Sequence, residues 1–265
     1  MADGLPLSSA AGAPLLGADD PAPFVLHRAQ GRSPFVLVAD HAGQAIPAAL
    51  GNLGLPPGEI DRHIGWDIGI AGVLGELSAL LDAWAIEQVY SRLVIDCNRP
   101  LASPTLIPPV SDGTLVGANQ TIDPAQRQAR IDAIHAPYHA TIAAELDRRA
   151  ASGQRAVPIL LHSFTPVMAG FVRPWHCGVL YNRDTRLAHR LLTALLAEGD
   201  LVVGDNQPYA VNDDSDYGAN VHAEGRGLPY VEIEIRQDLI ADAAGQAAWA
   251  QRLARLLPPL LDDPA

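Results

Sequence analysis

The chain alternates between short apolar runs and longer amphipathic stretches. Val, Ile and Leu fill the short runs, whereas the longer stretches are rich in Ala, Leu and Arg and repeat their apolar residues every three or four positions. Such alternation is typical of strands that are connected by crossover helices. The pattern predicts strands at 35–39, 84–90, 157–161, 177–181, 201–203 and 230–235, and helices at 68–82, 124–150, 185–198 and 244–257.

The apolar runs also indicate how the strands are covered. The run 157–161, VPILL, is continuously apolar, as expected for a strand that is buried on both faces. We therefore predict an α/β fold, a three-layer sandwich with a mixed, mostly parallel sheet. The segments 99–123 and 205–229 are polar and lack a helical period, so we predict long loops there, and loops of this length often carry function.

Length and composition are consistent with one folded unit. The chain has 265 residues, 48% of them hydrophobic, and a mean hydropathy of +0.09, which suffices for a large core. Residues 1–23 are rich in Ala, Gly and Pro, and we predict that they form a flexible arm. Residues 24–265 are predicted to form a single domain.

Charge narrows the possible partners. The formal net charge is −12, and all 18 basic residues are Arg. This balance argues against nucleic acid or an anionic membrane surface as a partner, and the absence of Lys excludes a lysine Schiff base. The oligomeric state stays open.

The cysteines and the N-terminal residues give an indication of the cellular compartment of the protein. Cys97 and Cys177 lie in apolar or motif segments, so we expect buried thiols and no disulfide framework. Neither a signal-peptide pattern nor a long apolar span is present. We expect a cytoplasmic protein.

Two histidines follow apolar strands. His41 comes after the strand at 35–39, and His162 follows 157–161. Ligands of open α/β sheets bind at the carboxyl ends of strands, although either histidine alone could be a satisfied polar residue. With Asp67 as a third ligand, the set would match the two histidines and one carboxylate of catalytic zinc sites. His63, four residues before Asp67, is a further candidate ligand or a partner of Asp67.

A cluster of polar residues surrounds the segment 90–100. Arg92 and Arg99 offer the planar donor fork that matches a carboxylate, and Asn98 adjoins Arg99. We therefore expect a small-molecule substrate that carries a carboxylate. The alternative is an internal ion pair between one of these arginines and Asp96.

The strand predicted at 230–235 carries charge on one face. Two-residue alternation places Glu232, Glu234 and Arg236 together, opposite apolar neighbours. A carboxylate beside a metal site is the usual base for amide hydrolysis. Alternatively, this row could be the solvated face of an edge strand.

Other polar residues are less specific. Arg173 and the clusters at 205–209 and 222–227 could line a pocket or stabilise loops. His135 and His139 are four residues apart, but Pro137 stands between them and is expected to interrupt the helix, which favours a structural role. The chain contains neither a GxSxG elbow nor a GxxxxGK loop, which weakens serine-hydrolase and phosphate-binding interpretations.

The motifs DHAG, HIGWDIG, SRLVIDCNRP, LHSFTP, RPWH, GDNQPY and EIRQDL occur in this order and together resemble the N-formylglutamate amidohydrolase family, from about residue 35 to about residue 257. This resemblance implies a fold similar to zinc carboxypeptidases and aspartoacylases. It also implies hydrolysis of N-formyl-L-glutamate to formate and L-glutamate, with a divalent metal, zinc above all, as cofactor.

The same resemblance assigns roles to individual residues. His41 and His162 match the metal ligands. Gln44 stands where the carboxypeptidase pattern has a glutamate ligand, so Asp67 is assigned as the third ligand. Glu234 resembles the general base. The predicted substrate-binding residues are Arg92, Asn98, Arg99, Arg173 and Arg236, with Arg99 also counted as catalytic.

Two alternatives remain. The same metal machinery could act on another N-acyl amino acid or a small peptide, because specificity depends on loops that motifs do not describe. The presence of Gln44 also leaves room for a non-catalytic protein that binds a carboxylate or a metal.

Overall fold

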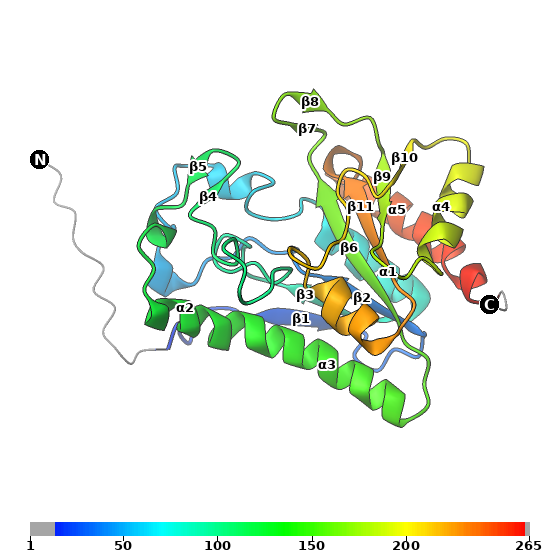
Figure 1. The fold of residues 1–265 in the computed structure, drawn as a ribbon, viewed down its shortest axis with the longest axis horizontal. Helices are drawn as coiled ribbons and strands as arrows, with labels where there is room; N and C mark the ends of the chain where they lie inside the picture. The colour runs from blue at the N-terminus through cyan, green and yellow to red at the C-terminus, as the bar shows by residue number, and fades with distance from the viewer. Residues whose placement is uncertain (1–13, 263–265) are drawn as a thin grey trace, which may run out of the picture.

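The computed structural model describes residues 14–262, which fold around a seven-stranded sheet (Figure 1). Its strands follow the order β1-β3-β2-β6-β11-β9-β10. Their bounds are β1 Phe24–His27, β2 Phe35–Ala39, β3 Trp84–Gln88, β6 Val157–Phe164, β9 Cys177–Leu180, β10 Val203–Asp205 and β11 Val231–Arg236.

Strand directions confirm the predicted mixed, mostly parallel sheet. The β1–β3 and β9–β11 pairs are antiparallel, and the remaining neighbours run parallel. Strand β11 lies between β6 and β9 in the interior of the sheet. The edge-strand alternative for this segment is therefore wrong, and its carboxylates are not a solvated outer row.

Helices cover both faces of the sheet and complete the three layers. Helices α1 (Ile70–Leu81), α4 (Ala188–Ala197) and α5 (Ala243–Leu256) pack on one face, where they share a core with alternate strand residues. Helix α3 (Ala136–Ala151) covers the other face together with the segment 91–119. The α/β class and the layered arrangement are confirmed.

The predicted helix at 124–150 is divided into three segments. Helix α2 (Pro124–Arg130) begins with a capping box in which Asp123 accepts from the Gln126 amide, and a π-helical segment, Ile131–His135, joins α2 to α3. Pro137 lies in the first turn of α3, where a missing N–H is tolerated. The expectation that Pro137 interrupts the helix is wrong, because the π-helical segment Ile131–His135 continues directly into α3.

Several short elements were not predicted. They are strand β1, the hairpin of β4 (Val110–Ser111) and β5 (Thr114–Leu115), and the hairpin of β7 (Val167–Met168) and β8 (Phe171–Val172). The strand predicted at 201–203 lies at Val203–Asp205, so its position was wrong by two residues. The predicted loop 205–229 contains a π-helical segment, Gly218–Ala223, and a 3₁₀ turn, Glu224–Arg226.

Part of the predicted arm contacts the domain. Leu15 and Leu16 pack against the core on the α3 side, and Tyr90 donates a hydrogen bond to the carbonyl of Pro21 at 2.6 Å. The rest of the arm, residues 1–13, lies outside the described residues. None of the helices within 14–262 is long and apolar enough to cross a membrane.

Candidate active site

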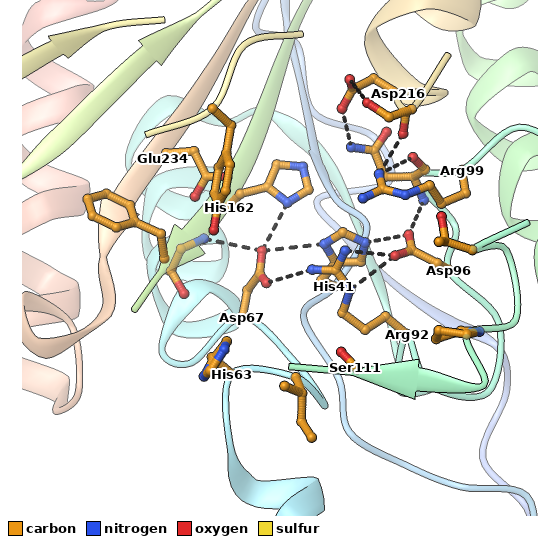
Figure 2. Close-up of a pocket in the computed structure, with 18 of the residues that line it drawn as sticks. His41, His63, Asp67, Arg92, Asp96, Arg99, Ser111, His162, Asp216 and Glu234 are labelled. Atoms are coloured by element: carbon orange, nitrogen blue, oxygen red, sulfur yellow. Dashed lines mark hydrogen bonds and ion pairs between the residues drawn. The ribbon is translucent and has the colours of Figure 1, made fainter. Parts of the chain in front are cut away.

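A cavity of about 530 Å³ opens on the sheet face opposite α1, α4 and α5 (Figure 2). It is lined by His41, which follows β2, by the carboxyl-terminal end of β6, by one face of β11, and by residues of the long polar segments. Its lining includes His41, Asp67, Arg92, Asp96, His162 and Glu234. The predicted location at strand ends is confirmed for the two histidines.

Three side chains from distant segments converge in this cavity. His41 follows β2, Asp67 precedes α1 and His162 lies near the end of β6; their potential ligand atoms are within 4.8 Å of one another. Nδ1 of His41 and Nδ1 of His162 lie 3.5 Å and 2.9 Å from Oδ2 of Asp67. Two imidazoles and one carboxylate are ligands that suit a divalent metal such as zinc.

Backbone contacts hold these residues in place. The Asp67 amide donates to the His41 carbonyl at 2.8 Å, and the Ser163 amide donates to Asp67 Oδ2 at 3.2 Å. Gly69, with φ of 85°, turns the chain into α1; a Cβ there would lie 2.1 Å from the carbonyl oxygen of Ile240. Glycine is therefore required immediately after the Asp67 segment.

The charges around the three residues favour a bound cation. Burial opposes ionisation of Asp67, but His41 and His162 lower its pKa below the usual value. Burial likewise disfavours a charged His162, yet Asp67, Glu232 and Glu234 raise its pKa well above normal. Nδ1 of His41 has no hydrogen-bond partner within the described chain. These residues fit a divalent metal, which would neutralise the surrounding negative charge.

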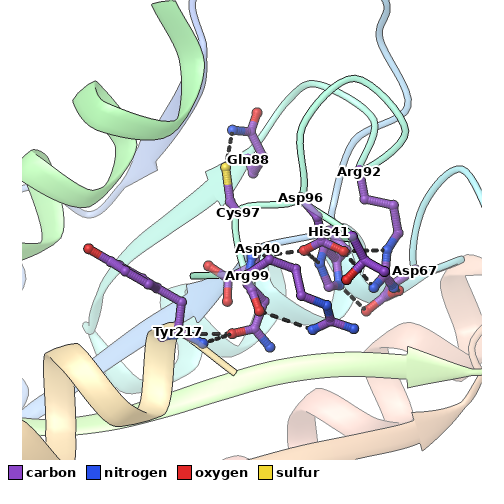
Figure 3. A network of polar contacts seen from close by, with 12 residues as sticks. Asp40, His41, Asp67, Gln88, Arg92, Asp96, Cys97, Arg99 and Tyr217 are labelled. Atoms are coloured by element: carbon purple, nitrogen blue, oxygen red, sulfur yellow. Dashed lines mark hydrogen bonds and ion pairs between the residues drawn. The ribbon is translucent and has the colours of Figure 1, made fainter. Parts of the chain in front are cut away.

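A second carboxylate orients His41 (Figure 3). Nε2 of His41 lies 2.7 Å from Oδ1 of Asp96, which leaves Nδ1 directed at Asp67. Arg92 in turn donates from Nη2 and Nε to Oδ2 of Asp96, at 2.7 and 3.0 Å. A carboxylate on the outer nitrogen of a ligating histidine fixes its tautomer and ring orientation. The ion-pair alternative is thus confirmed for Arg92, which nevertheless lines the cavity.

Asp40, adjacent to His41, lies close to His162, and the sequence analysis did not predict this contact. Its Oδ2 lies 3.9 Å from Nε2 of His162, and both of its carboxylate oxygens are buried without a hydrogen-bond partner in the described chain. Burial raises its pKa, against the opposing effect of His162. The strand-end motif DHAG thus supplies a ligand candidate and a buried acid side by side.

Asn98 and Arg99 line the cavity, but they also hold its wall. Oδ1 of Asn98 accepts from the amides of Tyr217 and Gly218, both at 3.0 Å. Arg99 donates from Nη1 to the carbonyls of Asn98 and Ser215, at 3.0 and 2.5 Å. The segment 215–218 therefore packs against the motif that was predicted to bind substrate.

The predicted alternation on β11 is confirmed for both glutamates. Glu232 and Glu234 line the cavity at 3% and 6% exposure. Burial raises the pKa of Glu232 to about 7 and the pKa of Glu234 to about 8. In register, Glu234 lies beside His162 on β6.

Two predicted substrate-binding arginines lie elsewhere. Neither Arg173 nor Arg236 is among the described residues that line the cavity. The guanidinium of Arg173 lies 4.7 Å from the ring centre of Tyr209, which lines the cavity, and Arg236 pairs with Asp238 at 2.7 Å. Arg236 is the last residue of β11 and also donates to the carbonyl of Trp175 at 3.3 Å. The roles of Arg173 and Arg236 in binding substrate stay predictions.

Three other histidines form a separate buried group. Nδ1 of His139 lies 2.9 Å from Nε2 of His222, and Nε2 of His139 lies 2.8 Å from the carbonyl of Cys97. The ring of His135 lies 4.3 Å from that of His139. Burial lowers the pKa of all three, that of His222 to about 4. The structural role expected for His135 and His139 agrees with this packing.

The structure also gives the positions of Gln44, His63 and the two cysteines. Gln44 is exposed, so it does not occupy the place of a ligand. His63 lines the cavity but does not belong to the convergent group, and its Nε2 lies 3.5 Å from Asp112. Cys97 and Cys177 are free and buried, as predicted.

The sheet, the cavity and the converging side chains together define an α/β protein with a candidate metal centre. The sequence profile described as N-formylglutamate amidohydrolase matches residues 33–241. The chain belongs to the N-formylglutamate amidohydrolase family and is an enzyme that hydrolyses a non-peptide amide.

Two solved structures show the same fold. The gene product Atu2144 from Agrobacterium tumefaciens is 36% identical, with a TM-score of 0.90, over 93% of this chain and 98% of that one. An N-formylglutamate amidohydrolase from Ralstonia eutropha JMP134 is 18% identical, with a TM-score of 0.63, over 90% of this chain and 99% of that one. No curated protein matches the chain.

Proposed function

We propose that the protein is a metal-dependent hydrolase of N-formyl-L-glutamate or a close N-acyl amino acid, releasing formate and L-glutamate from the former. The convergence of His41, Asp67 and His162 beside a buried glutamate carries this proposal. The family membership of the chain supports the reaction class.

The metal would be held by His41, Asp67 and His162, and when bound it supplies a Lewis acid for the acyl carbonyl and for water. Glu234 has a buried Oε2 without a hydrogen-bond partner among residues 14–262. This oxygen accepts a proton from the attacking water and returns it to the leaving nitrogen. Burial raises the pKa of Glu234 to about 8. A carboxyl group with a pKa close to neutral pH can both take up and release a proton during the reaction.

The other cavity residues position the substrate. Arg99 uses Nη1 for backbone carbonyls, and its planar group still offers donors to a carboxylate. Asn98 fixes the adjacent segment 215–218. Holding the amide in one orientation removes much of the entropic barrier of the reaction.

The test is formate release from N-formyl-L-glutamate by the purified protein, with metal content measured on the same sample. We expect release that stops on chelation and returns when zinc is added. Bound metal without release would point to another N-acyl substrate, which the size of the cavity would accommodate. Absence of both metal and release would contradict the proposal and favour a binding protein.

A further inference from the structure

The buried histidine group contacts the backbone of the motif that carries the proposed substrate-binding arginine. Nε2 of His139 lies 2.8 Å from the carbonyl oxygen of Cys97, and Nε2 of His135 lies 3.3 Å from the carbonyl oxygen of Arg99. A carbonyl oxygen can only accept, so both imidazoles donate at these contacts. The backbone is therefore held by a histidine on either side of Asn98.

These contacts also define the protonation of the group. Burial lowers the pKa of His139 well below its usual value, so the ring is neutral at neutral pH. With its proton on Nε2, the ring offers an acceptor at Nδ1. Nε2 of His222 lies 2.9 Å from this atom and donates to it. A chain of hydrogen bonds thus runs from His222 through His139 to the carbonyl of Cys97, without any charge that would need a buried counterion.

The same histidines pack against the opposite wall of the motif. The ring of Tyr217 lies 4.4 Å from the ring of His139 and 5.2 Å from that of His135. The Tyr217 amide donates to Oδ1 of Asn98 at 3.0 Å (Figure 3). The histidines therefore support Asn98 and Arg99 both through the backbone and through the segment that packs against them.

Two members of the group lie in π-helical segments. His135 is the last residue of the segment Ile131–His135, and His222 belongs to the segment Gly218–Ala223. π-Helical turns are rare and occur frequently at functional sites. Their presence at these two histidines favours a functional role over packing alone.

We propose that His135 and His139 are positioning residues, which hold the backbone around Asn98 so that the guanidinium of Arg99 faces the substrate carboxylate. The inference rests on the proposed function, in which Arg99 binds that carboxylate. Nη1 of Arg99 is already committed to the carbonyls of Asn98 and Ser215, so the backbone position decides where its other donors point. A misplacement of about 1 Å in a substrate-positioning group can lower the rate about 10²-fold.

The experiment compares two variants of one histidine in the hydrolysis of N-formyl-L-glutamate. His139→Leu removes the donor to Cys97, whereas His139→Gln keeps an N–H near the position of Nε2. We expect KM to rise about tenfold in His139→Leu, with kcat within about twofold of the wild type, and to return most of the way in His139→Gln. Metal content should be unchanged in both variants.

The matched control is His189→Leu. His189 is exposed, and its Nε2 lies 3.1 Å from the hydroxyl of Tyr181, so its loss should leave KM unchanged. Equal rises of KM in His139→Leu and His139→Gln would overturn the inference, because the donated hydrogen bond would then not hold the motif. A fall of kcat at constant KM in His139→Leu would overturn it as well.

A double-mutant cycle tests whether the effect acts through Arg99. In an Arg99→Gln background, where the guanidinium is already absent, His139→Leu should raise KM no further. The full tenfold rise in this background would mean that His139 acts independently of Arg99, and the positioning role would be rejected.

Failure of the proposed function has a different result. If the wild-type protein releases no formate, binding of N-acetyl-L-glutamate to the metal-loaded wild type and the two His139 variants is measured by calorimetry. Binding that weakens in His139→Leu and recovers in His139→Gln would support the positioning role without the reaction. Equal behaviour of the wild type and His139→Leu, including absence of binding by both, would overturn it.

Discussion

Two groups of histidines lie on the same side of the sheet and differ in their neighbours. His41 and His162 lie among carboxylates, and the pKa of His162 is raised well above its usual value. His135, His139 and His222 lie against one another and backbone carbonyls, and burial lowers their pKa values. The surroundings of the first group suit a bound cation, whereas burial favours the neutral form of the second.

The comparison shows that spacing in the sequence is a poor guide to a metal site. His135 and His139 have the four-residue separation of a helical ligand pair, yet within residues 14–262 neither forms an ion pair or hydrogen bond with a carboxylate. The ligand candidates His41, Asp67 and His162 come from three distant segments. The charges of the neighbouring residues distinguish the two groups of histidines more clearly than the spacing of the histidines in the sequence does.

The largest effect is expected from His162→Ala. Removing one of three ligand candidates should abolish tight metal binding and lower kcat/KM by about 10³-fold or more, because a catalytic metal contributes several kcal/mol. Metal content and formate release on the same preparation check this. The matched variant in the other group, His222→Gln, should keep its metal; if it loses metal as His162→Ala does, the distinction between the groups fails.

Replacing Glu234, the proposed general base, should separate metal binding from catalytic turnover. Glu234→Gln keeps the shape of the side chain but cannot accept the proton, so turnover should fall by about 10²- to 10⁴-fold. Metal content should stay at the wild-type level because Glu234 is outside the ligand group. Near-normal turnover in this variant would rule out Glu234 as the base.

Much of the fold could be predicted because buried strands and amphipathic helices have strong periods. The strand Phe35–Ala39 and the helix Ala243–Leu256 were predicted to within one residue. Strand β1 was missed because it is a four-residue edge strand with a half-exposed pattern, FVLH. The hairpins β4–β5 and β7–β8 have two-residue strands, too short for any period to emerge.

The site was predictable where a motif ends a strand and less so elsewhere. His41 and His162 were found because strand ends meet at one edge of a parallel sheet. Alternation grouped Arg236 with Glu232 and Glu234 but could not show that only the two glutamates of this row line the cavity. Asp216 lies in an irregular segment, and no local signal predicts its approach to Asn98 across 118 positions.

A smaller effect on the metal site should come from Asp96→Asn. Asp96 contacts the outer nitrogen of His41 at 2.7 Å, so the variant weakens ring orientation without removing a ligand. We expect metal affinity to fall about 10- to 100-fold. Competition with a chelator of known affinity measures this, and an unchanged affinity would show that Asp96 does not orient His41.

Protonation of His222 should lower the stability of the fold as the pH falls. The folded-state pKa of His222, about 4, lies below the value of about 6.5 for an unfolded histidine, so the unfolded chain binds the proton first as pH falls. The contribution of His222 to the free energy of unfolding is therefore fully present above about pH 6.5 and is lost progressively as the pH falls toward 4. Between pH 7 and pH 5 the free energy of unfolding should fall by roughly 2 kcal/mol from this residue alone. Urea unfolding at both pH values checks this, with His222→Gln as the variant. Its free energy of unfolding should decline less than that of the wild type over the same interval, because a glutamine takes up no proton; an equal decline would mean that His222 is not held neutral in the fold.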